Sequence, residues 1–113
     1  MARNGLDRAF EALADGTRRG VVELLRQGPR RAGQLADELA VSAPALSRHL
    51  RILREAQLVQ EQVAVDDARS RVYTLRREAF AQLRGGVDDI EALWQEQLAA
   101  FAEHAGRRAG KPR

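Results

Sequence analysis

The segment from Gln34 to Glu55 constrains the fold of this chain more than any other part of the sequence. It reads QLADELAVSAPALSRHLRILRE, and apolar residues recur at the spacing of one helix face on both sides of a break at Val41-Ser42. Ser42 is a favourable N-cap for the second helix, and Pro44 falls in its first turn, where a missing N–H costs nothing. Two short helices joined by a tight turn are therefore predicted. In helix-turn-helix proteins the second helix enters the DNA major groove.

The two sides of this second helix differ in chemistry. Leu46, Leu50 and Leu53 lie on one side and are expected to face the core. On the opposite side, Arg48 is the best placed base reader, because bidentate arginine contacts to guanine are the commonest specific contact. Arg51 is expected to reach phosphate, which positions a protein without specifying sequence. The simpler alternative for Arg48 is a solvated surface side chain.

Other polar and small residues around these arginines complete the predicted DNA-binding surface. Ser47 is suited to a base or a phosphate and Ala45 to a thymine methyl group, whereas Ser42 is expected to be a cap first. The full predicted set is Gln34, Ser42, Ala43, Pro44, Ala45, Ser47, Arg48, Arg51, Arg69 and Arg71. Arg30 and Arg31 suit a backbone clamp and a solvated loop about equally. His49 lies at the edge of the core face, where a packed, hydrogen-bonded role is favoured over a phosphate contact or a metal site.

Two extended segments follow the second helix. Residues 58–65 and 70–75 are rich in β-branched side chains, and Asp66 to Arg69 separate them, which predicts an antiparallel hairpin. A hairpin in this position is the wing of a winged helix. Strand alternation would place Arg69 and Arg71 on the same face, suited to a narrow minor groove.

Helices are also predicted on both sides of this core. Leu6, Phe10 and Leu13 indicate a short first helix, and a second over residues 21–25 ends at Gly28-Pro29. The last helix, about 78–105, carries apolar residues at nearly heptad spacing, and Gly85-Gly86 is expected to kink or briefly break it. Core or dimer seam is favoured over a ligand pocket for this stripe, with Trp94 as an anchor. The predicted dimer interface comprises Leu6, Phe10, Val87, Ile90, Trp94, Leu98 and Phe101.

The sequence predicts a single domain in which the DNA-binding part is basic and most of the last helix is acidic. We expect one domain over 1–113, with dimerisation helices at 1–15 and 78–105, a DNA-binding core at 16–77 and a flexible basic tail at 106–113. The net charge is only +3, but residues 85–105 hold five acids and no lysine or arginine. This acidic segment is expected to face away from DNA.

Several classes of protein are disfavoured by what the sequence lacks. There is no cysteine, and hence no disulfide, thiolate metal site or cysteine nucleophile. No stretch is apolar enough to span a membrane, and no export signal is recognised, so a cytoplasmic protein is expected. Phosphate-loop, zinc-protease and serine-hydrolase motifs are missing. We therefore predict neither an enzyme nor a bound cofactor or metal.

Three stretches together resemble the ArsR/SmtB family of bacterial transcriptional repressors. They are FEALADGTRRGVVELL, LADELAVSAPALSRHLRILREAQLV and SRVYTL, and the resemblance covers about residues 6–105. WQEQLAAF is similar to the subgroup with a tryptophan in its last helix. The resemblance implies a winged-helix homodimer, paired through its first and last helices, that binds an inverted-repeat operator and represses its own operon.

The chain departs from the metal-sensing members of that family. Those members carry a Cys-x-Cys motif in the helix that here spans 34–39, and a second site with Asp-x-His and His-x-x-Glu in the last helix. This chain has no cysteine, reads Asp89-Ile90-Glu91 at one position and Glu103-His104 near the other, and so lacks both patterns. Its wing reads DARSR where a Gly-Arg-Arg tip is common.

The sequence therefore predicts a dimeric, winged helix-turn-helix repressor whose partners are operator DNA and a second copy of itself. The alternative is a winged-helix protein-interaction module without specific DNA binding, because the basic patch between Arg48 and Arg71 is modest. Sensing of a metal or small molecule would be an addition to repression, and the sequence names no effector.

Overall fold

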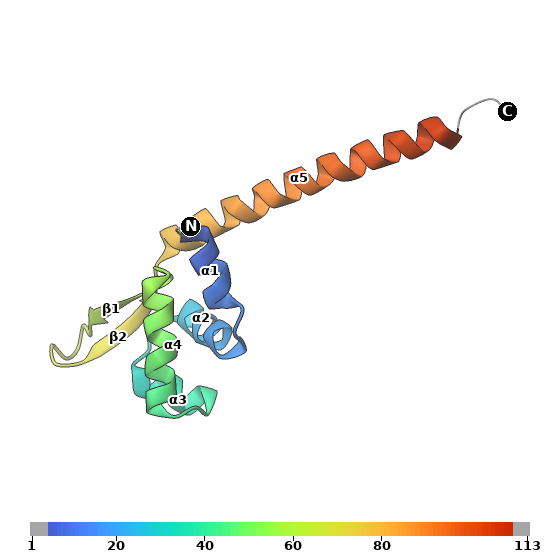
Figure 1. The fold of residues 1–113 in the computed structure, drawn as a ribbon. Helices are drawn as coiled ribbons and strands as arrows, with labels where there is room; N and C mark the ends of the chain where they lie inside the picture. Colours follow the sequence, from blue (N-terminus) through green and yellow to red (C-terminus); the bar gives the residue numbers. More distant parts are fainter. Residues whose placement is uncertain (1–4, 110–113) are drawn as a thin grey trace.

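The computed structural model describes residues 5–109 and has five helices and one antiparallel hairpin (Figure 1). In chain order the elements are α1 (Gly5–Leu13), α2 (Gly16–Gln27), α3 (Ala32–Leu39), α4 (Ala43–Glu55), β1 (Val59–Val63), β2 (Arg71–Leu75) and α5 (Arg77–Ala109). The first four helices and the hairpin form a small body, from which α5 projects (Figure 1). The predicted winged helix-turn-helix, with about five helices and two strands, is confirmed.

The starts of α2 and α4 are fixed by side-chain caps. The Asp15 carboxylate accepts a hydrogen bond from the Arg18 backbone N–H at 3.1 Å. The Ser42 hydroxyl accepts one from the Ala45 backbone N–H at 3.2 Å, and Pro44 lies in the first turn of α4, as the sequence predicts. Each cap satisfies one of the N–H groups that a helix start leaves without an internal partner.

Leucine and valine side chains from α2, α3, α4, β1 and the residue before β1 form the centre of the body. The fully buried side chains are Val21, Leu35, Leu46, Leu53, Leu58 and Val59. Leu50 is also buried, so the predicted core face of α4 is confirmed. Because α3 and α4 both bury leucines in this one cluster, their relative position is set by the core as well as by the turn between them.

The hairpin is shorter than predicted and has an extra partner. Its register runs from Val59 opposite Leu75 to Val63 opposite Arg71. The backbone of Arg30 pairs with Tyr73 on the free edge of β2, through hydrogen bonds of 2.8 and 3.2 Å. The wing is therefore tied to the segment that leads into α3.

Helix α5 is continuous, so the predicted break at Gly85-Gly86 is wrong, and the ribbon shows no sharp bend (Figure 1). Gly86 faces α1, where an added Cβ would lie only 2.7 and 2.8 Å from the two methyl carbons of Leu6. The absent side chain therefore lets α1 approach α5 closely, and the helix tolerates the glycine. The helix also runs beyond the expected end at 105, to Ala109, and residues 110–113 of the predicted basic tail lie outside the described residues.

Candidate nucleic-acid interface

The outward face of α4 presents two arginines without intramolecular partners. Arg48 and Arg51 are exposed, and neither side chain makes a hydrogen bond or ion pair with another described residue. By contrast, Arg54 in the last turn is held 3.2 Å from the Glu61 carboxylate of β1. Unpaired guanidinium groups keep all their donors for a ligand that carries phosphate or carbonyl oxygens.

The first turn of α4 lies beside these arginines. The exposed residues there are Ser42, Ala43, Pro44 and Ser47, and Ala45 is half-buried. Because the Ser42 hydroxyl oxygen already accepts from the helix backbone, its structural role as a cap is present in the free protein. Figure 1 shows the start of α4 with α3 at the end of the body that is remote from α5. The acidic stretch 85–105 is thus distant from this surface.

Gln34, Arg30 and Arg31 make contacts within the chain that the sequence does not indicate. The Gln34 side-chain oxygen accepts from the Arg31 backbone N–H at 2.8 Å, which closes the first turn of α3. The Arg30 guanidinium folds back onto the carbonyls of Gly28 and Pro29, at 3.0 and 3.1 Å. Arg31 lies 3.5 Å from a carboxylate oxygen of Asp66 in the wing, and that pair is largely exposed.

The wing brings one predicted arginine onto a strand and leaves the other in the turn. Arg71 begins β2, whereas Arg69 precedes the strand, so the alternation expected to place both on one face does not apply. Asp67 holds the turn: its carboxylate accepts from the Arg69 backbone N–H at 3.0 Å and the Ser70 hydroxyl at 2.8 Å. Donation by the Arg69 N–H, followed by that of Ser70, lowers the pKa of the Asp67 carboxyl.

His49 is packed and hydrogen-bonded, as favoured from the sequence. Its side chain is 22% exposed, and its Nδ1 lies 3.2 Å from a guanidinium nitrogen of Arg18 on α2. Arg18 was not identified from the sequence as a residue of this surface. The signal available was its place directly after the Asp15-Gly16-Thr17 helix start, which cannot indicate which helix its side chain reaches.

Comparison with known proteins places this geometry in a family. Residues 15–61, from the start of α2 into β1, match the model of the bacterial regulatory protein, arsR family. The HTH-type transcriptional regulator Rv2034 of Mycobacterium tuberculosis is 44% identical over 97 residues, covering 86% of this chain and 85% of that protein. The chain belongs to the arsR family of bacterial regulatory proteins. It is accordingly a DNA-binding transcriptional regulator.

Other arsR-family and repressor proteins extend this relationship. The ArsR-like transcriptional regulator from Rhodococcus sp. RHA1 superposes with a TM-score of 0.77 at 29% identity, covering 89% of this chain and 92% of that one. The transcriptional repressor SdpR of Bacillus subtilis is 36% identical over 56 residues, covering 50% of this chain and 62% of that protein. The similarity to the Rhodococcus structure therefore extends into α5.

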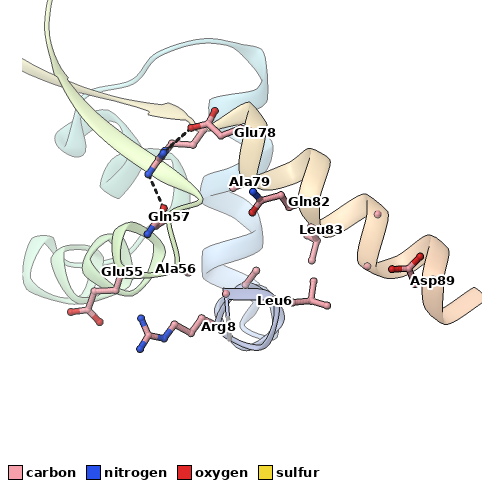
Figure 2. A pocket seen from close by; sticks show the side chains of 15 residues that line it. Leu6, Arg8, Glu55, Ala56, Gln57, Glu78, Ala79, Gln82, Leu83 and Asp89 are labelled. Carbon is pink, nitrogen blue, oxygen red and sulfur yellow. Dashed lines mark hydrogen bonds and ion pairs between the residues drawn. The ribbon is translucent and has the colours of Figure 1, made fainter. Parts of the chain in front are cut away.

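A groove of about 720 Å³ separates α1, the end of α4 and the start of α5 (Figure 2). Leu6 points toward Leu83 across it, and Arg76 at its rim donates to Gln57 at 3.2 Å and to Glu78 at 2.9 Å. Its lining mixes apolar side chains with both signs of charge. Over residues 5–109, no group of three His, Cys, Asp or Glu side chains is placed to hold a metal ion. No helix in the same range is long and apolar enough to cross a membrane.

Beyond this groove, α5 carries an uncovered apolar stripe. Val87, Ile90, Leu93, Trp94, Leu98 and Phe101 are between 45% and 72% exposed. Phe80 and Leu83, earlier in the same stripe, pack against the core. The structure thus divides the predicted seam into a part that belongs to the body and a part that is open.

Proposed function

We propose that this arsR-family member is a homodimeric transcriptional repressor that recognises an inverted-repeat operator through α4. The observation that carries the proposal is the outward face of α4, where Arg48 and Arg51 are exposed and unpaired while Arg30, Arg31 and Arg54 are engaged within the chain. Free guanidinium groups on a helix that can enter the major groove are suited to base edges and phosphates.

Each predicted contact has a role in this proposal. Arg48 reads a base, Arg51 binds phosphate, and Ser47 and Ala45 contact the adjacent base pair. Around them, Ser42, Ala43 and Pro44 bring the start of α4 close to the DNA backbone. The Gln34 side-chain nitrogen reaches a phosphate, while its oxygen accepts from the backbone at the start of α3. Arg69 and Arg71 extend contact to the minor groove from the wing.

The proposed dimer forms through α1 and α5. The Cα radius of gyration is 20.7 Å, whereas a compact chain of this length would have a radius of about 13 Å. An uncovered apolar stripe on so extended a helix favours burial against a second copy, with Leu6, Phe10, Val87, Ile90, Trp94, Leu98 and Phe101 at the interface. Two copies would present two α4 helices to half-sites about one DNA turn, roughly 34 Å, or more apart.

Repression in this proposal follows from occupying a promoter and excluding polymerase. The name of the related SdpR, a transcriptional repressor, supports this direction of regulation. Phosphate contacts would dominate the affinity, so binding would weaken steeply with salt.

The test is fluorescence anisotropy of the full chain on the DNA upstream of its own gene, at two salt concentrations, beside a scrambled duplex. Preferential binding to the upstream DNA that weakens with salt is expected. Equal or absent binding to the two duplexes would contradict the proposal. That result would favour a protein partner for the outward face of α4.

A further inference from the structure

Arg18 joins three helices at the edge of the proposed DNA-binding surface. Its Nε donates to the Ala12 carbonyl at 2.6 Å, and Nη2 donates to the Glu11 carbonyl at 3.5 Å. These carbonyls lie in the last turn of α1, where a helix leaves acceptors without internal donors. The remaining nitrogen, Nη1, lies 3.2 Å from Nδ1 of His49 on α4. One side chain of α2 therefore ties the end of α1 to the helix that carries Arg48.

As a hydrogen bond, this contact requires one tautomer of His49. A guanidinium group has donors and no acceptor, so Nδ1 must be the acceptor in the contact. The ring hydrogen is then on Nε2 and the imidazole is neutral. A protonated ring carries hydrogen on both nitrogens and would meet Arg18 with two like charges and no acceptor.

Asp15 provides the alternative partner for a protonated His49. Its Oδ2 lies 3.8 Å from the same Nδ1, at the start of α2. The backbone N–H of Arg18 donates to this carboxylate and lowers the pKa of Asp15, which therefore stays charged at neutral pH. Asp15 and Arg18 both lie against the Nδ1 edge of the ring. Nearby helices also carry Glu11 on α1, Asp37 and Glu38 on α3, and Arg48 and Arg51 on α4 itself.

The remaining contacts of α4 with the body are mostly apolar. Leu46, Leu50 and Leu53 bury one face of the helix and so set its approximate rotation. A hydrogen bond weakens steeply when its angle changes. The Arg18–His49 contact is therefore suited to restrict the rotation of α4 further, and with it the direction of Arg48.

We propose that Arg18 and His49 are positioning residues for operator recognition. The neutral His49 ring, held by Arg18, fixes the angle at which α4 presents Arg48. Protonation exchanges Arg18 for Asp15 as the partner of the ring, which changes the angle of α4 and weakens operator binding. This inference rests on the proposed function. The direction of the pH effect distinguishes this role from simple electrostatics, since added positive charge beside DNA would by itself strengthen binding.

The experiment measures operator affinity of the full chain near pH 8 and near pH 5.5, which spans ordinary histidine titration. His49→Asn keeps an acceptor oxygen near the Nδ1 position and does not titrate. The matched control is His104→Asn, because His104 on α5 is exposed and is the only other histidine in the sequence. Wild type and His104→Asn should lose affinity about 2- to 12-fold at the lower pH, the value of one hydrogen bond, while His49→Asn stays nearly constant.

Four results would overturn the inference, and they separate it from the proposed function. A rise in wild-type affinity at low pH, or the same pH profile in all three proteins, would exclude the positioning role alone. Absent specific binding at both pH values would overturn the proposed function and the positioning role together. Nitrogen NMR of the free protein near pH 8 needs no DNA: an Nε2–H tautomer at His49 is expected, and an Nδ1–H tautomer or a charged ring would exclude the Arg18 contact.

Discussion

The body of the molecule and the distal half of α5 contain similar apolar residues, but the body buries them and α5 exposes them. In the body, Leu35 and Leu53 are completely buried among side chains of the same chain. On α5, Trp94 and Phe101 are 61% and 72% exposed. The body is therefore complete within one copy, whereas α5 needs another surface to bury its stripe.

The change occurs within one continuous helix. Phe80 and Leu83 pack on the body, and Gly86 lies against Leu6 of α1. From Val87 onward the stripe is open. One helix thus packs on the body over its first turns and leaves its remaining apolar stripe exposed, where the proposed dimer would bury it.

The largest expected effect is on the stability of the body. Leu53→Ala should lower the free energy of unfolding by about 2–5 kcal/mol, because it leaves a cavity in a closed core. Urea denaturation at low protein concentration would measure it. Leu93→Ala, the same change at a leucine that is 57% exposed on α5, is the matched control and should cost much less. Similar losses for both would contradict the division between the two regions.

Self-association should respond most to Trp94. Trp94→Ala is expected to weaken the proposed dimer by about 2 kcal/mol or more, since large aromatic anchors dominate interface energies. Sedimentation equilibrium would report the dissociation constant. Glu96→Ala, on the same exposed turn of α5, serves as the control, and an equal effect of the two changes would exclude Trp94 as an anchor.

Operator recognition should depend on Arg48. Arg48→Ala is predicted to cost about 1–3 kcal/mol in binding and to relax specificity at one base pair. Anisotropy across a set of single-base operator variants would show this. Arg107→Ala removes an arginine from the far end of α5 and should leave the pattern unchanged. If Arg48→Ala matches wild type on every variant, Arg48 does not read a base.

A smaller effect is expected at the cap of α4. Ser42→Ala should reduce the free energy of unfolding by about 0.5–2 kcal/mol, because the Ala45 N–H loses its acceptor. Ser47→Ala lies within the same helix without a capping role and should be neutral or slightly stabilising. Thermal denaturation of both variants compares the two sites. A loss for Ser42→Ala that does not exceed the loss for Ser47→Ala would show that the cap contributes little.

The smallest effect concerns the wing and pH. The folded-state pKa of Asp67 is lowered, so its stabilising contribution is fully present above the unfolded-state pKa and is lost as pH falls through the folded-state value. Acidification should therefore loosen the turn and speed amide hydrogen exchange at Arg69, after correction for the intrinsic rate. Asp67→Asn should reduce that pH response. An unchanged response would rule out the Asp67 carboxylate as its source.

Features set by local sequence were predictable, and features set by distant contacts were not. The leucine spacing of α4, the Ser42 cap and the place of Pro44 in the first turn depend on neighbours in the chain, and the structure confirms them. The role of Gly86 depends on Leu6, which is remote in sequence, so helix propensity alone suggested a kink. Arg18 likewise depends on His49 of another helix. Which candidate residues touch DNA stays a prediction, because contact with a ligand is not encoded in intramolecular packing.

Sedimentation velocity of the full chain, alone and with operator DNA, tests most directly whether the open half of α5 is completed by a second copy. We predict a dimer of the free protein and two protein copies on each operator. A monomeric free protein that binds each operator specifically as a single copy would contradict this prediction, because the apolar stripe of α5 would then have no role in recognition.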